Sequence, residues 1–264
     1  MTASVNGAGC AVLGASDPAE KVALTRRFAE DWRAGRLALG GEARLPDRPA
    51  RPALPELQPP RDMPRRRAAR SREGRIALLH ALAHIELNAI DLAWDLVARF
   101  GGPDLPRDFH DDWIAVAAEE AEHFALITTR LGAAGARYGD LPAHDGLWEA
   151  AEATAGDLLA RLAVVPLVLE ARGLDVTPAM ILRLDRNGDP ESAAALRILL
   201  ADEIGHVAAG VRWFRWECAQ RALDPADTWR GLVRAHFKGA LKPPFNDAAR
   251  RAAGMEPAFY EAAC

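Results

Sequence analysis

Cysteine, tyrosine and long apolar runs are scarce in this sequence, and each scarcity argues against a class of protein. The 264 residues include three cysteines, Cys10, Cys218 and Cys264, which lie far apart and form no CxxC pair. We therefore expect neither a disulfide framework nor a zinc knuckle, and we expect a reducing cytoplasm. The sequence holds no run of 18 apolar residues, which predicts that no segment spans a membrane. The amino-terminal segment also lacks the basic start of a secretory signal.

An excess of positive charge is also missing. The net charge is −4, with 27% charged and 50% hydrophobic residues, which is ordinary for a globular domain and gives no general basic field for nucleic acid. One basic run, RRRAARSREGR, covers residues 65–75. We interpret it as the solvated start of a helix; the alternative is an RNA contact through Arg65, Arg66 and Arg67.

The pattern along the chain predicts an all-α protein. Asp17 and Glu20 form a capping box around Pro18, which indicates a short helix over residues 17–35, and the many prolines of 39–64 indicate an extended arm. Helical periodicity then covers 74–100, 107–133, 145–173 and 190–222, with turn-forming sequences between them. We therefore expect an N-terminal helix and arm over 1–72, a four-helix bundle over 73–222 and a mostly irregular C-terminal extension with short helices over 223–264.

Each of the four predicted helices carries a glutamate on its apolar face. The residues three, four and seven positions away from these glutamates are nearly all apolar or histidine; the glutamates are Glu86, Glu120, Glu170 and Glu203. Two of the four are followed on the same face by a histidine, in Glu120/His123 and Glu203/His206. The offsets repeat, because Glu86 and Glu170 are 84 residues apart, whereas Glu120 and Glu203 are 83 apart. This repeat predicts two matched helix pairs whose six side chains converge.

Four inward carboxylates need positive charge beside them, because a buried unpaired carboxylate is costly. Neither lysine nor arginine lies on these four stripes. Two divalent cations would balance the charge, and carboxylates with one imidazole per metal suit iron or manganese. Ferritin-like di-iron proteins and their designed relatives bind metals with this pattern, one Glu from each of two helices and Glu-x-x-His from each of the other two. We therefore predict a ferritin-like bundle with two iron ions, or manganese in their place, held by these six residues.

The acidic neighbours of the predicted ligands differ in direction. Glu119 and Asp202 lie four residues before the two histidines, and we expect them to accept a hydrogen bond from the imidazole N–H of each. Glu122 lies about 200° around the helix from Glu120 and is expected to face solvent. We expect the remaining histidines to be ordinary polar or core residues, the tryptophans to pack the bundle, and the two tyrosines to lie outside the helix centres.

Several motifs together resemble one known family. The stretches HIELNAIDLAWD, EEAEHF, LEARGLDVTP, DEIGHV and LKPPFNDAAR, in this order, resemble the DUF455 family of ferritin-like proteins over most of the chain. The resemblance implies a ferritin-like bundle with a carboxylate-bridged di-iron site at the six residues named above. The pattern is more distantly similar to tRNA-modifying di-iron hydroxylases, although a shared site type does not define a substrate.

Three functions fit this prediction. The first is an O2-activating di-iron oxidoreductase, a hydroxylase or oxidase, which needs an external electron donor and acts on a small molecule or a modified RNA. The two Glu-x-x-His motifs favour it over ferritin-type storage. The second is iron handling or peroxide scavenging, resembling a ferroxidase or a rubrerythrin, although a cysteine-based rubredoxin module is lacking. The third is a binding module in which the metals only brace the bundle.

Overall fold

The structure is a computed structural model that describes residues 4–41, 44–59, 62–63 and 71–261. In these ranges the secondary structure is helical, apart from isolated bridges that pair Ser4 with Ala38 and Leu57 with Ala143. The protein is therefore all-α, as predicted. The chain divides into two compact units, Met1–Trp148 and Glu149–Cys264. The predicted RNA contact through Arg65, Arg66 and Arg67 lies outside the described residues.

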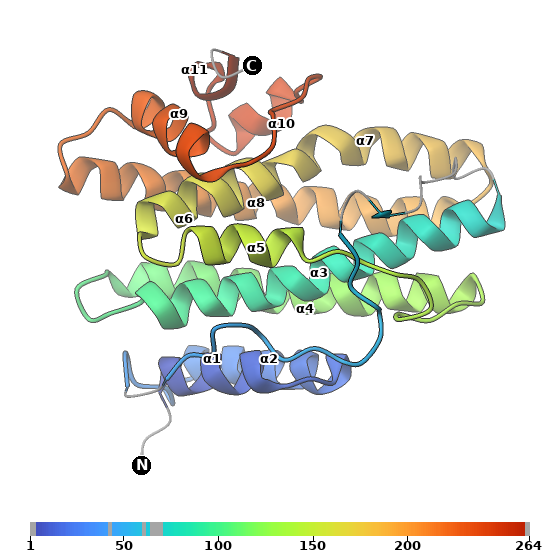
Figure 1. Cartoon of the computed structure of the whole chain (residues 1–264), viewed down its shortest axis with the longest axis horizontal. Coiled ribbons are helices and arrows are strands. Elements are labelled where there is room, and N and C mark those ends of the chain that lie inside the picture. Colours follow the sequence, from blue (N-terminus) through green and yellow to red (C-terminus); the bar gives the residue numbers. More distant parts are fainter. Residues whose placement is uncertain (1–3, 42–43, 60–61, 64–70, 262–264) are drawn as a thin grey trace. The chain divides into compact units, whose positions relative to one another are not determined.

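Four helices build the first unit: α1 (Val5–Gly14), α2 (Pro18–Arg33), α3 (Arg72–Phe100) and α4 (Arg107–Ala133). The helices α3 and α4 pack along each other, while α1 packs on α3 and α2 on α4 (Figure 1). Asp17 caps α2 as predicted, since its side chain accepts hydrogen bonds from the backbone N–H groups of Ala19 and Glu20 at 2.7 and 3.0 Å. The helix α1 was not predicted from the sequence.

The proline-rich arm is extended, as predicted, over its described residues. It has no helix between residues 44 and 59, and it ends in backbone hydrogen bonds to the loop after α4, including Gln58 N–H to the Ala143 carbonyl at 2.8 Å. Arg51 of the arm reaches the buried side chains of Asn88 and Asp91 on α3. The arm is therefore attached to α3 through its side chains as well as through its backbone.

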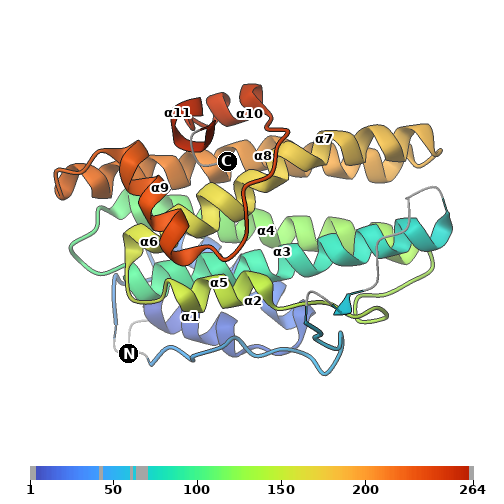
Figure 2. The ribbon, with the colours of Figure 1, turned by 45° about the horizontal axis from the view of Figure 1, so that its top comes forward.

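The second unit contains the remaining helices. They are α6 (Leu158–Val164), the π-helical segment η2 (Val165–Glu170), α7 (Ala171–Arg186), α8 (Pro190–Gln220), α9 (Pro225–His236), α10 (Asp247–Ala252) and α11 (Pro257–Tyr260); α5 (Gly146–Ala153) begins in the first unit. In this unit α7 and η2 pack along α8, and α6 packs against α8 and α9 (Figure 2). Short helices in the C-terminal extension were predicted, and α9, α10 and α11 are of this kind.

The boundaries of the predicted third helix were wrong. The sequence predicted one helix over 145–173, whereas the structure has a separate α5, a new start at Leu158 with Asp157 as the N-cap, and continuous helical structure to Arg186. The turn predicted directly after residue 173 does not occur, and α7 continues through Pro178 to Arg186. Pro178 removes the hydrogen bond that the Leu174 carbonyl would accept, and the Asn246 side chain donates to that carbonyl instead at 3.0 Å. A residue 72 positions away in the sequence therefore keeps α7 intact.

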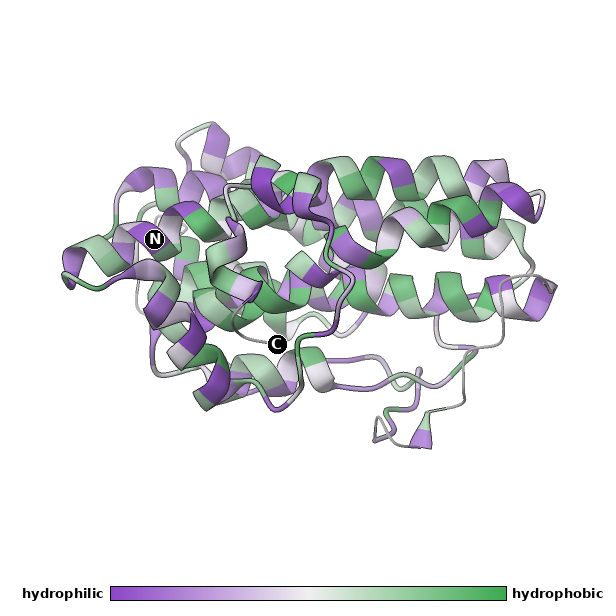
Figure 3. Ribbon diagram, turned by 90° about the horizontal axis from the view of Figure 1, so that it is seen from above, coloured by the Kyte–Doolittle hydropathy of each residue, from purple (hydrophilic) through white to green (hydrophobic). Residues whose placement is uncertain are grey.

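By length and composition alone, α3 is apolar enough to cross a membrane, but 67% of its apolar window is buried in the structure. Its buried residues include Glu86, Asp91 and Asp95, and the last forms an ion pair with Arg99 at 2.7 Å. Figure 3 shows apolar and polar positions interleaved along the long helices. We therefore interpret α3 as a core helix.

Candidate metal centre

Three of the predicted ligands meet inside the first unit. Glu86 lies on α3, whereas Glu120 and His123 lie one turn apart on α4, and all three are at least 97% buried. The Nδ1 atom of His123 lies 3.4 Å from Oε2 of Glu120 and 3.5 Å from Oε2 of Glu86. One ligand atom from each residue lies within 4.8 Å of the others. Two carboxylates and an imidazole at this separation can hold a metal ion.

The electrostatics of this cluster favour a cation. Burial by itself would disfavour a charged imidazole, but hydrogen bonds and charge from Glu120 and Glu86 outweigh it and raise the pKa of His123 to about 11. The two carboxylates therefore stabilise positive charge placed between them. A divalent ion meets the same demand and accepts the same oxygen and nitrogen donors.

The second unit holds a matching pair on α8. The Nδ1 atom of His206 lies 3.7 Å from Oε2 of Glu203; the His206 side chain is buried, while that of Glu203 is 15% exposed. The spacing of three residues places both side chains on one face of α8, as in Glu120 and His123 on α4. The second Glu-x-x-His motif thus has the local geometry predicted for it.

Glu170 is the last residue of the π-helical segment η2, immediately before α7. It is half-buried, and its helix packs against α8. A π-helical turn widens the helix and shifts the direction of the side chains that follow; such turns are frequent at functional sites. Regular helical periodicity could not reveal it, so the direction of Glu170 is decided by η2 and not by the uniform spacing that we assumed.

A close approach between α8 and η2 positions this segment. A Cβ atom built on Gly210 would lie 2.5 Å from the Pro166 Cβ and 2.8 Å from the Leu167 Cδ1. Only glycine fits at this position without a shift of its neighbours. Gly210 therefore allows α8 to support the segment that carries Glu170.

The flanking acidic residues lie as follows. Glu119 is exposed and Asp202 is half-buried; their predicted hydrogen bonds to the histidines stay a prediction. Glu122 faces solvent, as predicted, and forms an ion pair with Arg26 of α2, with the Glu122 side chain 61% exposed. The sequence did not reveal this partner.

The other α3 histidines are buried polar residues, as predicted. The His84 Nδ1 lies 2.8 Å from the Tyr138 hydroxyl and its Nε2 lies 3.0 Å from the His144 carbonyl. The Nε2 of His80 accepts a hydrogen bond from the backbone N–H of Gly139 at 3.0 Å. These contacts attach the loop after α4 to α3. We therefore assign both histidines a structural role.

Fold and site together define an all-α protein with a buried carboxylate and histidine cluster suited to a metal ion. The chain belongs to the family described as "Protein of unknown function (DUF455)", whose pattern it matches over residues 14–261. It is similar to an uncharacterized protein of Haemophilus influenzae, with 43% identity over 211 residues that cover 77% of this chain and 72% of that protein. No solved structure matches the chain.

Proposed function

We propose that this protein is a di-metal oxidoreductase in which Glu86, Glu120, His123, Glu170, Glu203 and His206 together hold two iron ions, or two manganese ions, in a ferritin-like bundle. The observation that carries the proposal is the buried cluster of two glutamates and His123, whose Glu-x-x-His motif returns 83 residues later on α8. Four carboxylates and two imidazoles match the charge and the donor preference of two divalent ions.

The residues of the first unit fit such a metal. Their donor atoms are carboxylate oxygens and an imidazole nitrogen, they lie within 4.8 Å of one another, and they are buried away from water. The proposal is supported by the raised pKa of His123, since Glu120 and Glu86 favour positive charge beside them. When bound, a pair of iron ions would supply O2 activation and the oxidation of a substrate.

The chain's own residues bind and orient the metals and exclude water from them. The apolar neighbours of Glu120 on α4, Trp113, Val116 and Ile127, are all at least 95% buried. A dry surrounding of this kind strengthens the electrostatic interactions of the carboxylates and protects reactive species from solvent. We further propose a cytoplasmic protein that receives electrons from an external donor and oxidises a small molecule or a modified RNA.

Metal analysis of the full-length protein from iron- and manganese-replete cells tests the proposal. We expect two metal ions per chain and the loss of at least one in Glu120→Ala. The matched control is Glu122→Ala, in the same helix but exposed, which should keep both. A chain that carries neither metal would overturn the proposal.

Oxygen uptake separates the oxidoreductase from the alternatives. The reduced, metal-loaded protein should consume O2 in an amount that matches its bound metal when no further Fe(II) is added. Repeated oxidation of added Fe(II) would instead identify an iron-handling protein. Bound metal without any O2 uptake would identify a metal-braced binding module.

A further inference from the structure

The repeat in the sequence extends beyond the predicted ligands to a buried aspartate in each unit. Asp91 follows Glu86 by five residues, and Asp175 follows Glu170 by five, so the two aspartates are 84 residues apart, as the two glutamates are. Both aspartate side chains are completely buried. The helices concerned are the two that supply a lone glutamate without a histidine. The same pair of acidic residues thus occurs on both.

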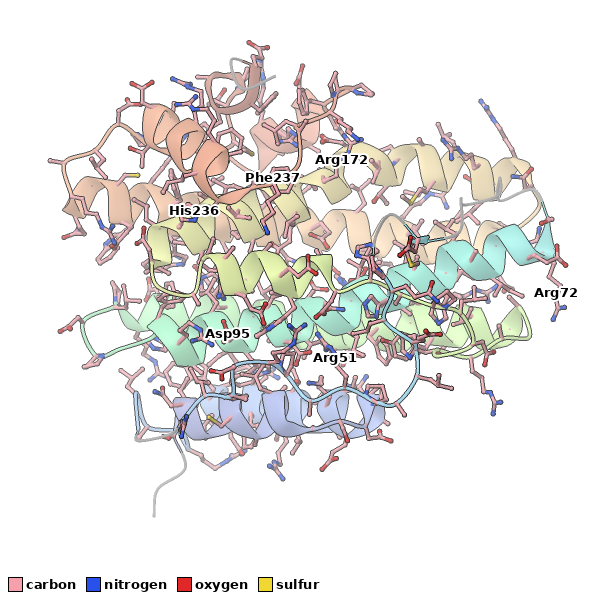
Figure 4. All side chains as sticks on the ribbon, viewed as in Figure 1. Arg51, Arg72, Asp95, Arg172, His236 and Phe237 are labelled. Carbon is pink, nitrogen blue, oxygen red and sulfur yellow. The ribbon has the colours of Figure 1, made fainter. Side chains whose placement is uncertain are left out.

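An arginine from outside these helices binds each aspartate. In the first unit, Arg51 of the arm forms an ion pair with Asp91, and its other terminal nitrogen donates to the Asn88 side chain at 2.5 Å. Lys21 of α2 forms a second ion pair with Asp91. Figure 4 shows Arg51 beside α3. The arm therefore contributes a half-buried positive charge to α3.

In the second unit, Arg250 of α10 binds Asp175 with two hydrogen bonds, from Nε at 2.9 Å and from a terminal nitrogen at 2.7 Å. The guanidinium lies 4.9 Å from the ring centre of Phe245 and 4.6 Å from that of Tyr260, and the arginine is 97% buried. The neighbouring Arg172 of α7 donates to the Lys242 carbonyl at 2.6 Å, where the C-terminal segment passes α7 (Figure 4). The C-terminal extension thus does in this unit what the arm does in the first.

The position of each aspartate lets it control the direction of the glutamate. On α3, five residues correspond to about 140° of rotation and about 7.5 Å of rise, so Asp91 and Glu86 face different sides of the helix. Asp175 lies on α7, five residues after Glu170 at the end of η2. An ion pair to the aspartate would oppose rotation of the helix about its axis and so hold the direction of the glutamate. The same residues also contact the backbone near each glutamate. The Asn88 side chain, which accepts a hydrogen bond from Arg51, donates to the His84 carbonyl at 2.7 Å, and Arg250 lies 3.4 Å from the Ala171 carbonyl.

We propose that Arg51 and Arg250 are equivalent positioning residues for the metal centre, which orient Glu86 and Glu170 through Asp91 and Asp175. The inference rests on the proposed function, because it assigns the two glutamates as ligands. The inference gives the arm and the C-terminal extension the same role. Each supplies the arginine for one lone-glutamate helix.

A titration of the metal-free, full-length protein with Co2+ tests the inference, with the absorption spectrum of bound Co2+ as a report on ligand geometry. The variants are Arg51→Ala and Arg250→Ala, with Arg51→Lys and Arg250→Lys to keep the charge without the planar fork. Arg26→Ala is the control, because its partner Glu122 is exposed. Groups that orient metal ligands typically change metal affinity 10- to 100-fold. We therefore expect the Kd for Co2+ to rise about tenfold or more in each alanine variant, with a changed spectrum at saturation.

The outcomes separate the two proposals. If the wild-type protein binds no Co2+, the proposed metal centre fails and the inference fails with it. If the wild-type protein binds Co2+ and the folded alanine variants bind it with the same Kd and spectrum, the arginines serve stability alone, and only the inference is overturned. If the alanine variants do not fold, the lysine variants decide. A wild-type Kd and spectrum in both would overturn the inference, whereas weaker binding and a changed spectrum would support it.

Discussion

Replacing Gly210 by alanine should destabilise the second unit and disturb the segment that carries Glu170. The new Cβ would lie 2.5 Å from the Pro166 Cβ, closer than carbon atoms approach without repulsion, and the proline ring cannot rotate away. Overpacking of this kind costs about 1–3 kcal/mol. The gain from replacing glycine within a helix offsets about 1 kcal/mol of that cost. The net change is therefore a loss of up to about 2 kcal/mol.

Gly205→Ala is the matched control, because Gly205 lies on the same helix α8 and its Cβ would meet no atom within 4 Å. It should stabilise the protein by about 0.5–1 kcal/mol, since only the helix propensity changes. The two variants should therefore differ by about 1–3 kcal/mol in the free energy of unfolding.

Urea unfolding followed by circular dichroism measures this difference. A Co2+ titration adds a second readout, because a shift of η2 moves Glu170; we expect weaker binding in Gly210→Ala and unchanged binding in Gly205→Ala. Equal stability of the two variants would refute the close approach of α8 to η2. Lower stability with unchanged Co2+ binding would show that η2 does not position a ligand.

Three further predictions concern polar groups at buried or half-buried positions. Burial lowers the pKa of His84 from 6.5 to about 4. Its neutral form therefore contributes stability above pH 6.5, and this contribution falls as the pH drops toward 4. About 2 kcal/mol of the free energy of unfolding should be lost by pH 5. Urea titrations at pH 7.5 and 5 should show a smaller loss in His84→Asn, and an identical pH dependence would contradict this. Lys21→Ala should cost about 3 kcal/mol in urea unfolding, because it leaves the buried Asp91 with one cation fewer. A loss below about 1 kcal/mol would show that Arg51 of the arm alone neutralises Asp91. Asn246→Ala should cost about 1–2 kcal/mol in the wild-type protein. The cost should be smaller in a Pro178→Ala background, where the backbone N–H of residue 178 returns. Additive losses in this double-mutant cycle would show that the Asn246 side chain does not replace the backbone donor that Pro178 lacks.

The regular helices could be predicted closely. The helix α4, Arg107–Ala133, has the predicted bounds, because an uninterrupted apolar stripe lies between proline- and glycine-containing turns. The helix α8 begins at the predicted Pro190 for the same reason. The helix end predicted at residue 173 was wrong, because local rules count the hydrogen bond lost at Pro178 and cannot count the donor that a distant Asn246 provides.

In the candidate site, too, some side-chain directions could be predicted from the sequence and one could not. His123 follows Glu120 by three residues, and in a regular helix this spacing alone places both on one face. Glu122 was correctly directed to solvent by the same geometry. The direction of Glu170 could not be derived in this way, because η2 departs from regular helical geometry just before it.

The sequence by itself determined the all-α class, the inward direction of Glu86 and Glu120 and the repeat of 83–84 residues that marks the candidate ligands, since a regular helix converts spacing into direction. Only the tertiary structure decided that Glu86 meets His123, that a π-helical turn precedes Glu170, and that Asp91 and Asp175 each receive an arginine. Arg51 and Arg250 lie 40 and 75 residues from these aspartates in the chain. No local periodicity connects residues so far apart, and their pairing follows from the way the arm and the C-terminal extension pack on the helices.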